Sequence, residues 1–413
     1  CDSHLTITGF GVDTKGEILI ADFQREPGGL FTLVPTPKDA RPSVFPRKLS
    51  ESGLFESVKG HVMKPGLIPY SVSAVLWSDG AAKERWLGLP PEQKIGYKNK
   101  RGFDFPDETV IVKSFSLEME EGNPQSKRWI ETRFLTKQNN DWHGYSYSWN
   151  DGETEGELIE AKGADREFTI KTPAGPKKLN WRYPSRSECM VCHCQTVNFV
   201  LGFNELQMNH EHVYPPSPTA PGVGGEGVRE NQLAVFERLG LFNKFDWASA
   251  ARDQLRKDLK SSGMKEDLAK ETATRGQREP AASSLLPFAP EKLKKLVDPY
   301  DKKQDLTARV RSYLHSNCAQ CHVESGGGNA QMELGFTNTL EQMKIVDVNP
   351  VHDTFGLKDA KLVAPGHPER SVLLHRISHR DKGHMPPLAT RVVDQRMVET
   401  IREWILQLPA PPP

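Results

Sequence analysis

The sequence predicts a multidomain α+β protein in which a β-rich unit is followed by an all-α unit. The first observation is length, because 413 residues exceed what a single hydrophobic core usually organises. The second is that residues from about 45 to 200 contain runs of alternating β-branched and aromatic residues, the pattern of half-buried strands. The third is that apolar residues near the C-terminus repeat at helical spacing.

Composition excludes two classes of protein. Lys+Arg and Asp+Glu number 54 each, so no basic excess recruits nucleic acid. Hydrophobic residues make up 37% of the chain, and no run approaches the 18 apolar residues that a membrane span requires. We therefore expect no nucleic-acid partner and no membrane span, with a lipid anchor as the remaining route to a membrane.

The N-terminal half is expected to be mostly β-sheet. Residues 1–36 alternate short apolar strands with Gly and Asp turns, as one sheet of a β-propeller does, or as a hairpin docked on the next domain does. Residues 37–235 form the β-rich domain, with strands predicted over residues 109–117, 129–135, 144–149 and 166–170.

The C-terminal half is expected to be helical. Residues 236–298 are rich in charged residues and alanine and read as a helical connector. Residues 299–413 form the all-α unit, bracketed by a helix from Leu306 toward residue 318 and a closing helix through Ile401 and Trp404.

Four of the six cysteines fall into two copies of one motif. The sequence reads Cys189-Met-Val-Cys192-His193 and Cys318-Ala-Gln-Cys321-His322. Two thiols three positions apart can each add to one vinyl group of the same macrocycle, and the following histidine supplies an imidazole to the iron. The motifs predict two covalently bound haem c groups, with His193 and His322 as iron ligands.

Other chemistries also use paired cysteines. The two pairs could share one structural zinc, or form a thiol–disulfide centre, but neither explains a histidine directly after both pairs. Cys1 and Cys194 remain outside the motifs. They either form a disulfide, or Cys194 is a small buried thiol.

The sixth ligand of each iron determines its chemistry, because a thioether favours electron transfer and an open position favours catalysis. For the second haem we predict Met385, in the Gly383-His-Met-Pro-Pro-Leu388 loop, with Met332, His352 and His375 as rivals. For the first haem, Met208, His210 and His212 follow the motif on a predicted helix. Met208 is a candidate ligand, but a methionine at this spacing is more often core, and the iron is then either open or ligated by another residue.

Two further details concern the first motif. Ser185 or Ser187 is placed to cap a short helix that carries Cys189 to His193. Arg186 is placed to meet a haem propionate, although an ordinary surface arginine explains it as well. With both haems included, the predicted fold class is a β-rich first haem domain followed by an all-α cytochrome c domain.

Several phrases of the sequence resemble a known family. They include Phe45-Pro-Arg-Lys-Leu-Ser50, Val75-Leu-Trp-Ser-Asp-Gly-Ala81, the two cysteine motifs and Met385-Pro-Pro-Leu388. Over residues 40–410 the chain is similar to bacterial two-haem c-type cytochromes, which are often fused C-terminal to a sugar-dehydrogenase-like β-propeller. The resemblance implies electron transfer in the periplasm or at the cell surface, and a propeller domain missing at the N-terminus.

A second resemblance concerns the first haem domain alone. Its strands, the run Phe105-Pro-Asp-Glu-Thr-Val-Ile-Val-Lys113 and its late haem motif look like those of cytochromes c′-β. That resemblance implies a five-coordinate iron and a catalytic lysine near the macrocycle at Lys113. A lysine on an ordinary sheet edge is the alternative.

Three functions remain open. The first is electron transfer between a redox partner protein, such as a dehydrogenase or cytochrome, and an acceptor. The second is a haem-dependent oxidoreductase, peroxidase-like or oxidising a small nitrogen compound at the first haem, with the second haem as relay. The third is a haem-based gas sensor. Because this class attaches haem outside the cytoplasm, we expect a periplasmic or extracytoplasmic protein in a mature or trimmed form.

Overall fold

The computed structural model describes residues 7–22, 29–34, 45–98, 102–214, 227–243, 256–257, 259–261, 265, 267, 286, 290–324 and 326–409. Its N-terminal element is an antiparallel meander of β1 (Ile7–Val12), β2 (Ile18–Asp22) and β3 (Gly29–Thr32). Large apolar side chains of this meander, such as Phe10 and Leu30, are exposed. The predicted strands of the N-terminal segment are therefore present.

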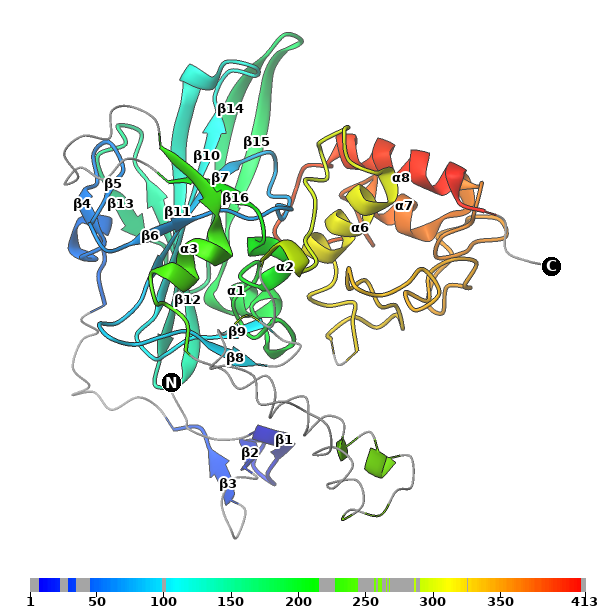
Figure 1. The fold of residues 1–413 in the computed structure, drawn as a ribbon, viewed down its shortest axis with the longest axis horizontal. Coiled ribbons are helices and arrows are strands. Elements are labelled where there is room, and N and C mark those ends of the chain that lie inside the picture. The colour runs from blue at the N-terminus through cyan, green and yellow to red at the C-terminus, as the bar shows by residue number, and fades with distance from the viewer. Residues whose placement is uncertain are drawn as a thin grey trace.

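A six-stranded antiparallel sheet organises the first half of the chain (Figure 1). Its order is β13-β12-β11-β10-β7-β6. The strands are β6 (Ile68–Tyr70), β7 (Ala82–Gly88), β10 (Val110–Glu118), β11 (Lys127–Gln138), β12 (Asp141–Trp149) and β13 (Gly156–Leu158). Strands β10, β11 and β12 confirm three of the strands predicted from alternation, and β14 confirms the fourth.

The two faces of this sheet bury different sets of side chains, because successive residues of a strand point to opposite faces. On β10, Ile111 packs into one core with Phe203 and Phe236. Val112, the next residue, packs into another core with Tyr147 and Trp149. The first of these faces is the one that meets the motif helix described below.

Smaller elements surround the sheet. Four hairpins pair β4 (Phe55–Ser57) with β5 (Val62–Met63), β8 (Gly96–Lys98) with β9 (Gly102–Asp104), β14 (Ala164–Thr172) with β15 (Gly175–Tyr183), and β16 (Glu211–Tyr214) with β17 (Val228–Asn231). The helices of this half are α1 (Arg186–Cys192), α2 (Glu205–Met208) and α3 (Gln232–Arg238).

The C-terminal part lies beside this β-rich part (Figure 1). It contains α6 (Leu306–Asn317), α7 (Val372–Ile377) and α8 (Gln395–Gln407), so the two predicted bracketing helices are present. Helices α6 and α8 pack on each other, and Val310, Leu314, Ile401 and Trp404 share one core. Asp305 and Asp394 cap these two helices by accepting backbone N–H bonds.

The predicted fold class is nevertheless wrong. Among the described residues of this part, α-helix is confined to α6, α7 and α8. No all-α cytochrome c domain is therefore evident. Strand is the more abundant regular structure of the described chain. Glycines at 326–328 and prolines at positions such as 350 and 365 interrupt the segment between α6 and α7, where both residue types disfavour helix. Spacing at the two ends could not reveal that the intervening chain is loop.

The predicted connector at residues 236–298 lies mostly outside the described residues. Its first residues belong to the end of α3. No helix in the described part of the chain is long and apolar enough to cross a bilayer.

Candidate functional site

Helix α1 carries the first cysteine motif. Ser185 caps it by accepting a hydrogen bond from the backbone N–H of Glu188, and the Glu188 carboxylate accepts the N–H of Ser185 in return. This reciprocal cap confirms the predicted start of the helix. Cys189 and Cys192 stand on its turns, and His193 is its C-cap residue.

Helix α1 packs directly against strand β12 at Gly144. A Cβ atom at this position would lie 2.7 Å from the Cβ and 2.9 Å from the Sγ of Cys189. Any side chain here would therefore push the helix away from the sheet. Gly144 is what allows Cys189 to approach the sheet so closely.

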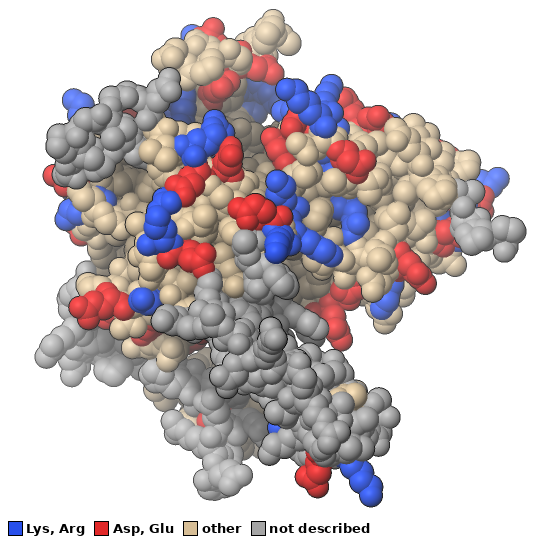
Figure 2. All heavy atoms as spheres, viewed as in Figure 1, with Lys and Arg blue, Asp and Glu red and all other residues tan. Residues whose placement is uncertain are grey.

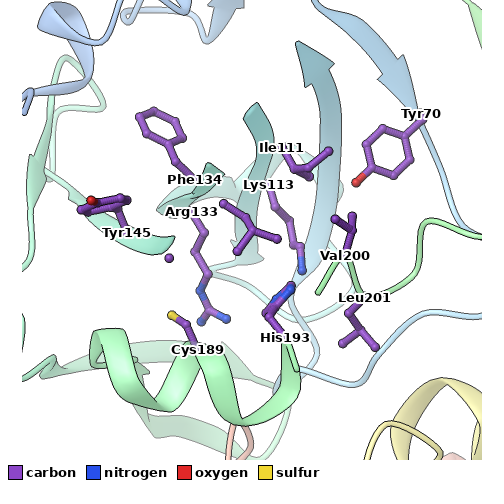
Figure 3. A pocket seen from close by; sticks show the side chains of 12 residues that line it. Tyr70, Ile111, Lys113, Arg133, Phe134, Tyr145, Cys189, His193, Val200 and Leu201 are labelled. Atoms are coloured by element: carbon purple, nitrogen blue, oxygen red, sulfur yellow. The ribbon is translucent and has the colours of Figure 1, made fainter. Parts of the chain in front are cut away.

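A cavity lies between the helix and the sheet (Figure 3). It encloses about 30 Å³, room for one or two water molecules, and the empty space counted together with the part open to solvent is about 430 Å³. Cys189 and His193 line it from the helix side, and Lys113 and Arg133 extend toward them from the sheet. Apolar walls come from residues such as Ile111 and Val200.

His193 is held in one tautomer. Its Nδ1 lies 2.7 Å from the backbone carbonyl of Phe199, and since a carbonyl only accepts, Nδ1 carries the proton. Its Nε2 is left with a free lone pair, the arrangement that histidine ligands of metals adopt. Burial and the nearby Lys113 ammonium lower the pKa of His193 to about 3, so the ring is neutral.

Lys113 and Arg133 are neighbours on adjacent strands. Burial and the Arg85 and Arg133 guanidinium groups lower the pKa of Lys113 to about 7. Arg133 forms a two-pronged ion pair with the fully buried carboxylate of Glu131, at 2.7 and 2.8 Å. The structure therefore brings Lys113, named from its resemblance, into the same cavity as the first motif.

The other residues predicted around the first motif do not line the cavity. Arg186 is exposed and stacks over the Tyr145 ring at 4.9 Å. Met208 is completely buried in the core with Phe203. His210 hydrogen-bonds to Ser71, as does His212. Arg85 and Arg133 were missed, because only the strand register places them beside Lys113.

The chain between the first motif and Met208 is less helical than its spacing predicts. Asn198 and Phe199 take left-handed backbone conformations, with φ of 49° and 65°, and end any helix there. Helix α2 covers only Glu205–Met208. The turn at 198–199 is also what brings the Phe199 carbonyl to His193.

The second motif follows the C-terminus of α6. Cys318 is the C-cap residue, and burial raises the pKa of its thiol to about 12. The carbonyl of His322 accepts the N–H of Leu334, while its Nδ1 is buried and has no hydrogen-bond partner. Gly328 passes close to the ring, since a Cβ there would lie 2.6 Å from Nδ1.

Met385 lies against the same core as the second motif. Met385, Met332 and Cys318 are all partly buried against the α6–α8 core. Of the two histidine rivals, His352 is exposed, and His375 lies on α7 with its ring 4.7 Å from that of His379. Met385 and Met332 thus remain the candidates that share the core with Cys318.

The end of the first motif lies close to the second motif, although the two are far apart in the sequence, because Cys194 directly follows His193. The Sγ atom of Cys194 is 3.7 Å from the carbonyl oxygen of Gln320, inside the second motif. Burial raises the pKa of Cys192 to about 11, and the neighbouring thiols of Cys321 and Cys194 add to that rise. The predicted pairing of Cys1 with Cys194 lies outside the described residues, because Cys1 is not among them.

The side chains present suit covalent haem. Each motif offers two thiols and one histidine, His193 presents an unprotonated Nε2 beside a cavity, and Gly144 provides the close seat for Cys189. In the part of the chain that the structure describes, no group of three or more His, Cys, Asp or Glu side chains is arranged to hold a metal ion.

Comparison with known proteins gives no match. No protein-family model, no curated protein and no solved structure matches this chain.

Proposed function

We propose that the chain is a two-haem c-type cytochrome that carries electrons between a donor, such as a periplasmic dehydrogenase, and an acceptor. The observation that carries the proposal is the approach of the two Cys-x-x-Cys-His motifs, since Cys194, the residue directly after the first motif, has its Sγ 3.7 Å from the Gln320 carbonyl oxygen inside the second. The sequence contains both motifs but does not indicate that they lie close together in space. Their proximity is what electron exchange within one chain requires.

In this proposal the protein's own residues hold and tune the two centres. Each haem, when bound, supplies an iron that accepts and releases one electron. His193 and His322 are the protein ligands, and the Phe199 carbonyl fixes the His193 ring by accepting its Nδ1 proton. Met385 is the proposed sixth ligand at the second site, where a thioether would favour the reduced state.

The surface and the site of action complete the proposal. Lys and Arg side chains are interspersed with Asp and Glu on the face seen in Figure 2, so neither sign of charge dominates that face. A redox partner would then be recognised by local contacts rather than by long-range attraction. Because covalent haem attachment takes place outside the cytoplasm, we propose a periplasmic or other extracytoplasmic location.

The test is the rate of electron exchange between the two sites. Holo-protein is reduced rapidly with less than one equivalent of electrons, and the absorbance of both haems is followed. We expect a redistribution whose rate does not change with protein concentration. A rate that rises in proportion to protein concentration would show exchange between molecules and contradict the proposal.

Two matched variants make that experiment specific. Replacing Cys189 and Cys192 by alanine removes the first site, and replacing Cys318 and Cys321 removes the second. Each variant keeps the other motif, so each supplies the spectrum of one haem alone. Neither variant should show the redistribution phase.

A second candidate function is a haem-dependent oxidoreductase at the first site. The observation that favours it is the cavity, whose described lining contains no methionine and no histidine other than His193. An iron bound there would have Lys113 and Arg133 nearby and no second histidine or methionine ligand from the described lining. A high-spin ferric signal and carbon monoxide binding at one of the two haems would support this function, and two fully low-spin haems would rule it out.

A further inference from the structure

One row of side chains crosses the face of the sheet that meets α1. Tyr70 of β6 is the direct partner of Arg85 on β7, and Arg85 is the partner of Lys113 on β10. Lys113 in turn faces Arg133 of β11, and Arg133 faces Ser146 of β12. Directly paired residues point to the same face, so three cationic side chains stand side by side on neighbouring strands.

The flanking rows show that these cations lie between two apolar cores. Two residues before Lys113 on the same face, Ile111 packs into the core that contains Phe203. Two residues after it, Phe115 packs into the core that contains Trp181. The row therefore lies between two apolar cores, with Arg85 only 8% exposed and with Lys113 and Arg133 partly buried.

Among the residues that the structure describes, one carboxylate belongs to this cluster, and it is already paired. Glu131 holds Arg133 with both oxygens, and it also accepts hydrogen bonds from the indole N–H of Trp181 and the hydroxyl of Ser146. The negative charge of Glu131 is thus balanced by the guanidinium of Arg133. Its remaining hydrogen-bonding capacity goes to neutral groups.

Arg85 and Lys113 are left without an acidic partner among the described residues. Arg85 donates one hydrogen bond of 3.4 Å to the carbonyl of Lys83, and Lys113 lies 5.8 Å from the centre of the Phe115 ring. A fourth cation, Lys83, is nearby and donates to the carbonyl of Leu76. Like charges on directly paired strand residues destabilise a sheet, and buried charges are normally paired.

We infer that the cavity beside Lys113 and Arg85 binds an oxyanion group, of the carboxylate or nitrite class, that neutralises this row. Lys113 lines the cavity and presents its ammonium toward the motif helix, and Arg85 is its direct partner on the neighbouring strand. The Tyr70 side chain lines the same cavity at the end of the row. An anion here would face His193 across the cavity.

Two sources could supply that group. One is a propionate of the haem held by Cys189 and Cys192, and the other is a small free oxyanion that enters the cavity. The first source rests on the proposed function. The second requires only the cavity and its cations, so the two sources can be separated by experiment.

The test uses the holo-protein, with nitrite as the probe. Nitrite binding is measured by calorimetry and by the change in haem absorbance, in the wild type and in Lys113→Met, Lys113→Arg and Lys177→Met. Lys177 is an exposed strand lysine on β15 and serves as the matched control. Because one charge-assisted hydrogen bond is lost, Lys113→Met should weaken binding by about tenfold or more, whereas Lys113→Arg and Lys177→Met should keep it.

The propionate source is tested in the same variants by resonance Raman spectroscopy. If nitrite does not bind, a shift of the haem propionate bending modes in Lys113→Met, absent in Lys177→Met, supports an oxyanion supplied by the haem. If nitrite does not bind and those modes do not move, the inference is overturned. Intact mass spectrometry separates this failure from failure of the proposed function, because it reports independently whether both haems are attached.

Discussion

Gly144 determines whether the first motif can reach the sheet. A methyl group at this position would lie 2.7 Å from the Cβ of Cys189. We predict that Gly144→Ala displaces α1 and prevents haem attachment at Cys189 and Cys192, while attachment at the second motif continues. Intact mass spectrometry would then show one haem per chain instead of two.

The control for this prediction is Gly152→Ala. Gly152 lies in a turn of the same half of the chain, and a Cβ there would have no neighbour closer than 3.8 Å. This variant should carry two haems. If Gly152→Ala loses a haem, or if Gly144→Ala carries two, then the close approach of Cys189 to Gly144 does not determine haem attachment.

His61 is predicted to make stability depend on pH. It is 9% exposed, stacks on Trp129 at 3.9 Å and pairs with the Ser114 hydroxyl at 2.7 Å. Burial lowers its pKa from 6.5 to about 4. Below pH 6.5 the unfolded chain therefore binds a proton that the folded chain excludes, and the free energy of unfolding falls as pH drops toward 4, by up to about 3 kcal/mol.

The measurement is denaturant unfolding at pH 7.5 and pH 5 in the wild type, His61→Gln and His352→Gln. His61→Gln should lose less stability than the wild type between these two pH values, whatever its stability at pH 7.5. His352 is exposed and provides the control. An equal loss in the wild type and in His61→Gln would rule out His61 as a source of the pH dependence.

At the scale of single residues, the sequence located the first cysteine motif but not the cations that surround it, and the haem chemistry of this motif stays a prediction. Cysteine spacing is a local signal, and it identified Cys189, Cys192 and His193 directly. Arg85 and Arg133 escaped notice because their proximity to Lys113 depends on strand register, which spacing does not reveal. Arg186 was considered either as a partner of a haem propionate or as an ordinary surface arginine, and its side chain is exposed and stacks on Tyr145.

At the scale of elements, the loop between β6 and β7 joins the two halves of the chain. Asp79 Oδ1 accepts three hydrogen bonds of 2.8 Å, from the Thr390 hydroxyl and from the backbone N–H groups of Arg391 and Val392. Trp77 adds a hydrogen bond from its indole to the Val392 carbonyl. This contact holds the segment that follows the Met385 loop.

We predict that Asp79→Ala loosens this junction. Three hydrogen bonds are lost, and φ at residue 79 is 54°, a conformation that Ala tolerates poorly. The free energy of unfolding should fall by about 1–3 kcal/mol, and a protease should cleave residues 380–392 more rapidly. Denaturant unfolding and timed proteolysis measure the two effects.

Asp79→Asn is the matched variant for this prediction. Its amide oxygen can accept the same three hydrogen bonds, and Asn tolerates a left-handed backbone. It should resemble the wild type in both measurements. If Asp79→Ala is as stable and as resistant to the protease as Asp79→Asn, the junction does not depend on this acceptor.

Helix ends and strands were predictable for physical reasons that are local, and the fold class was not. Period-3.6 spacing located α6 and α8, and period-2 alternation located β10, β11 and β12. The step from two helices to an all-α domain failed, because two bracketing helices do not determine the glycine- and proline-rich chain between Cys321 and α7. The prediction of a β-rich first half was correct, because the alternating residues that indicated strands belong to the strands themselves.

At the scale of the whole molecule, the main finding is the meeting of two motifs from different parts of the chain. The contact between Cys194 and Gln320 is reinforced nearby, because the Gln207 side chain donates 2.8 Å hydrogen bonds to the Ala74 carbonyl and to the Ser316 hydroxyl on α6. No single-sequence pattern reports such a contact. It turns two separate motif matches into one proposed electron-transfer unit.

The most direct test of this account is the number of haems covalently attached to one chain. The protein is produced in a host that matures c-type cytochromes in its periplasm, denatured to remove any loosely bound group, and weighed by intact mass spectrometry. The account predicts two haems on the wild-type chain and one on the variant in which alanine replaces Cys189 and Cys192. A denatured wild-type chain with the mass of the bare polypeptide, whose native form holds zinc instead of iron, would contradict it.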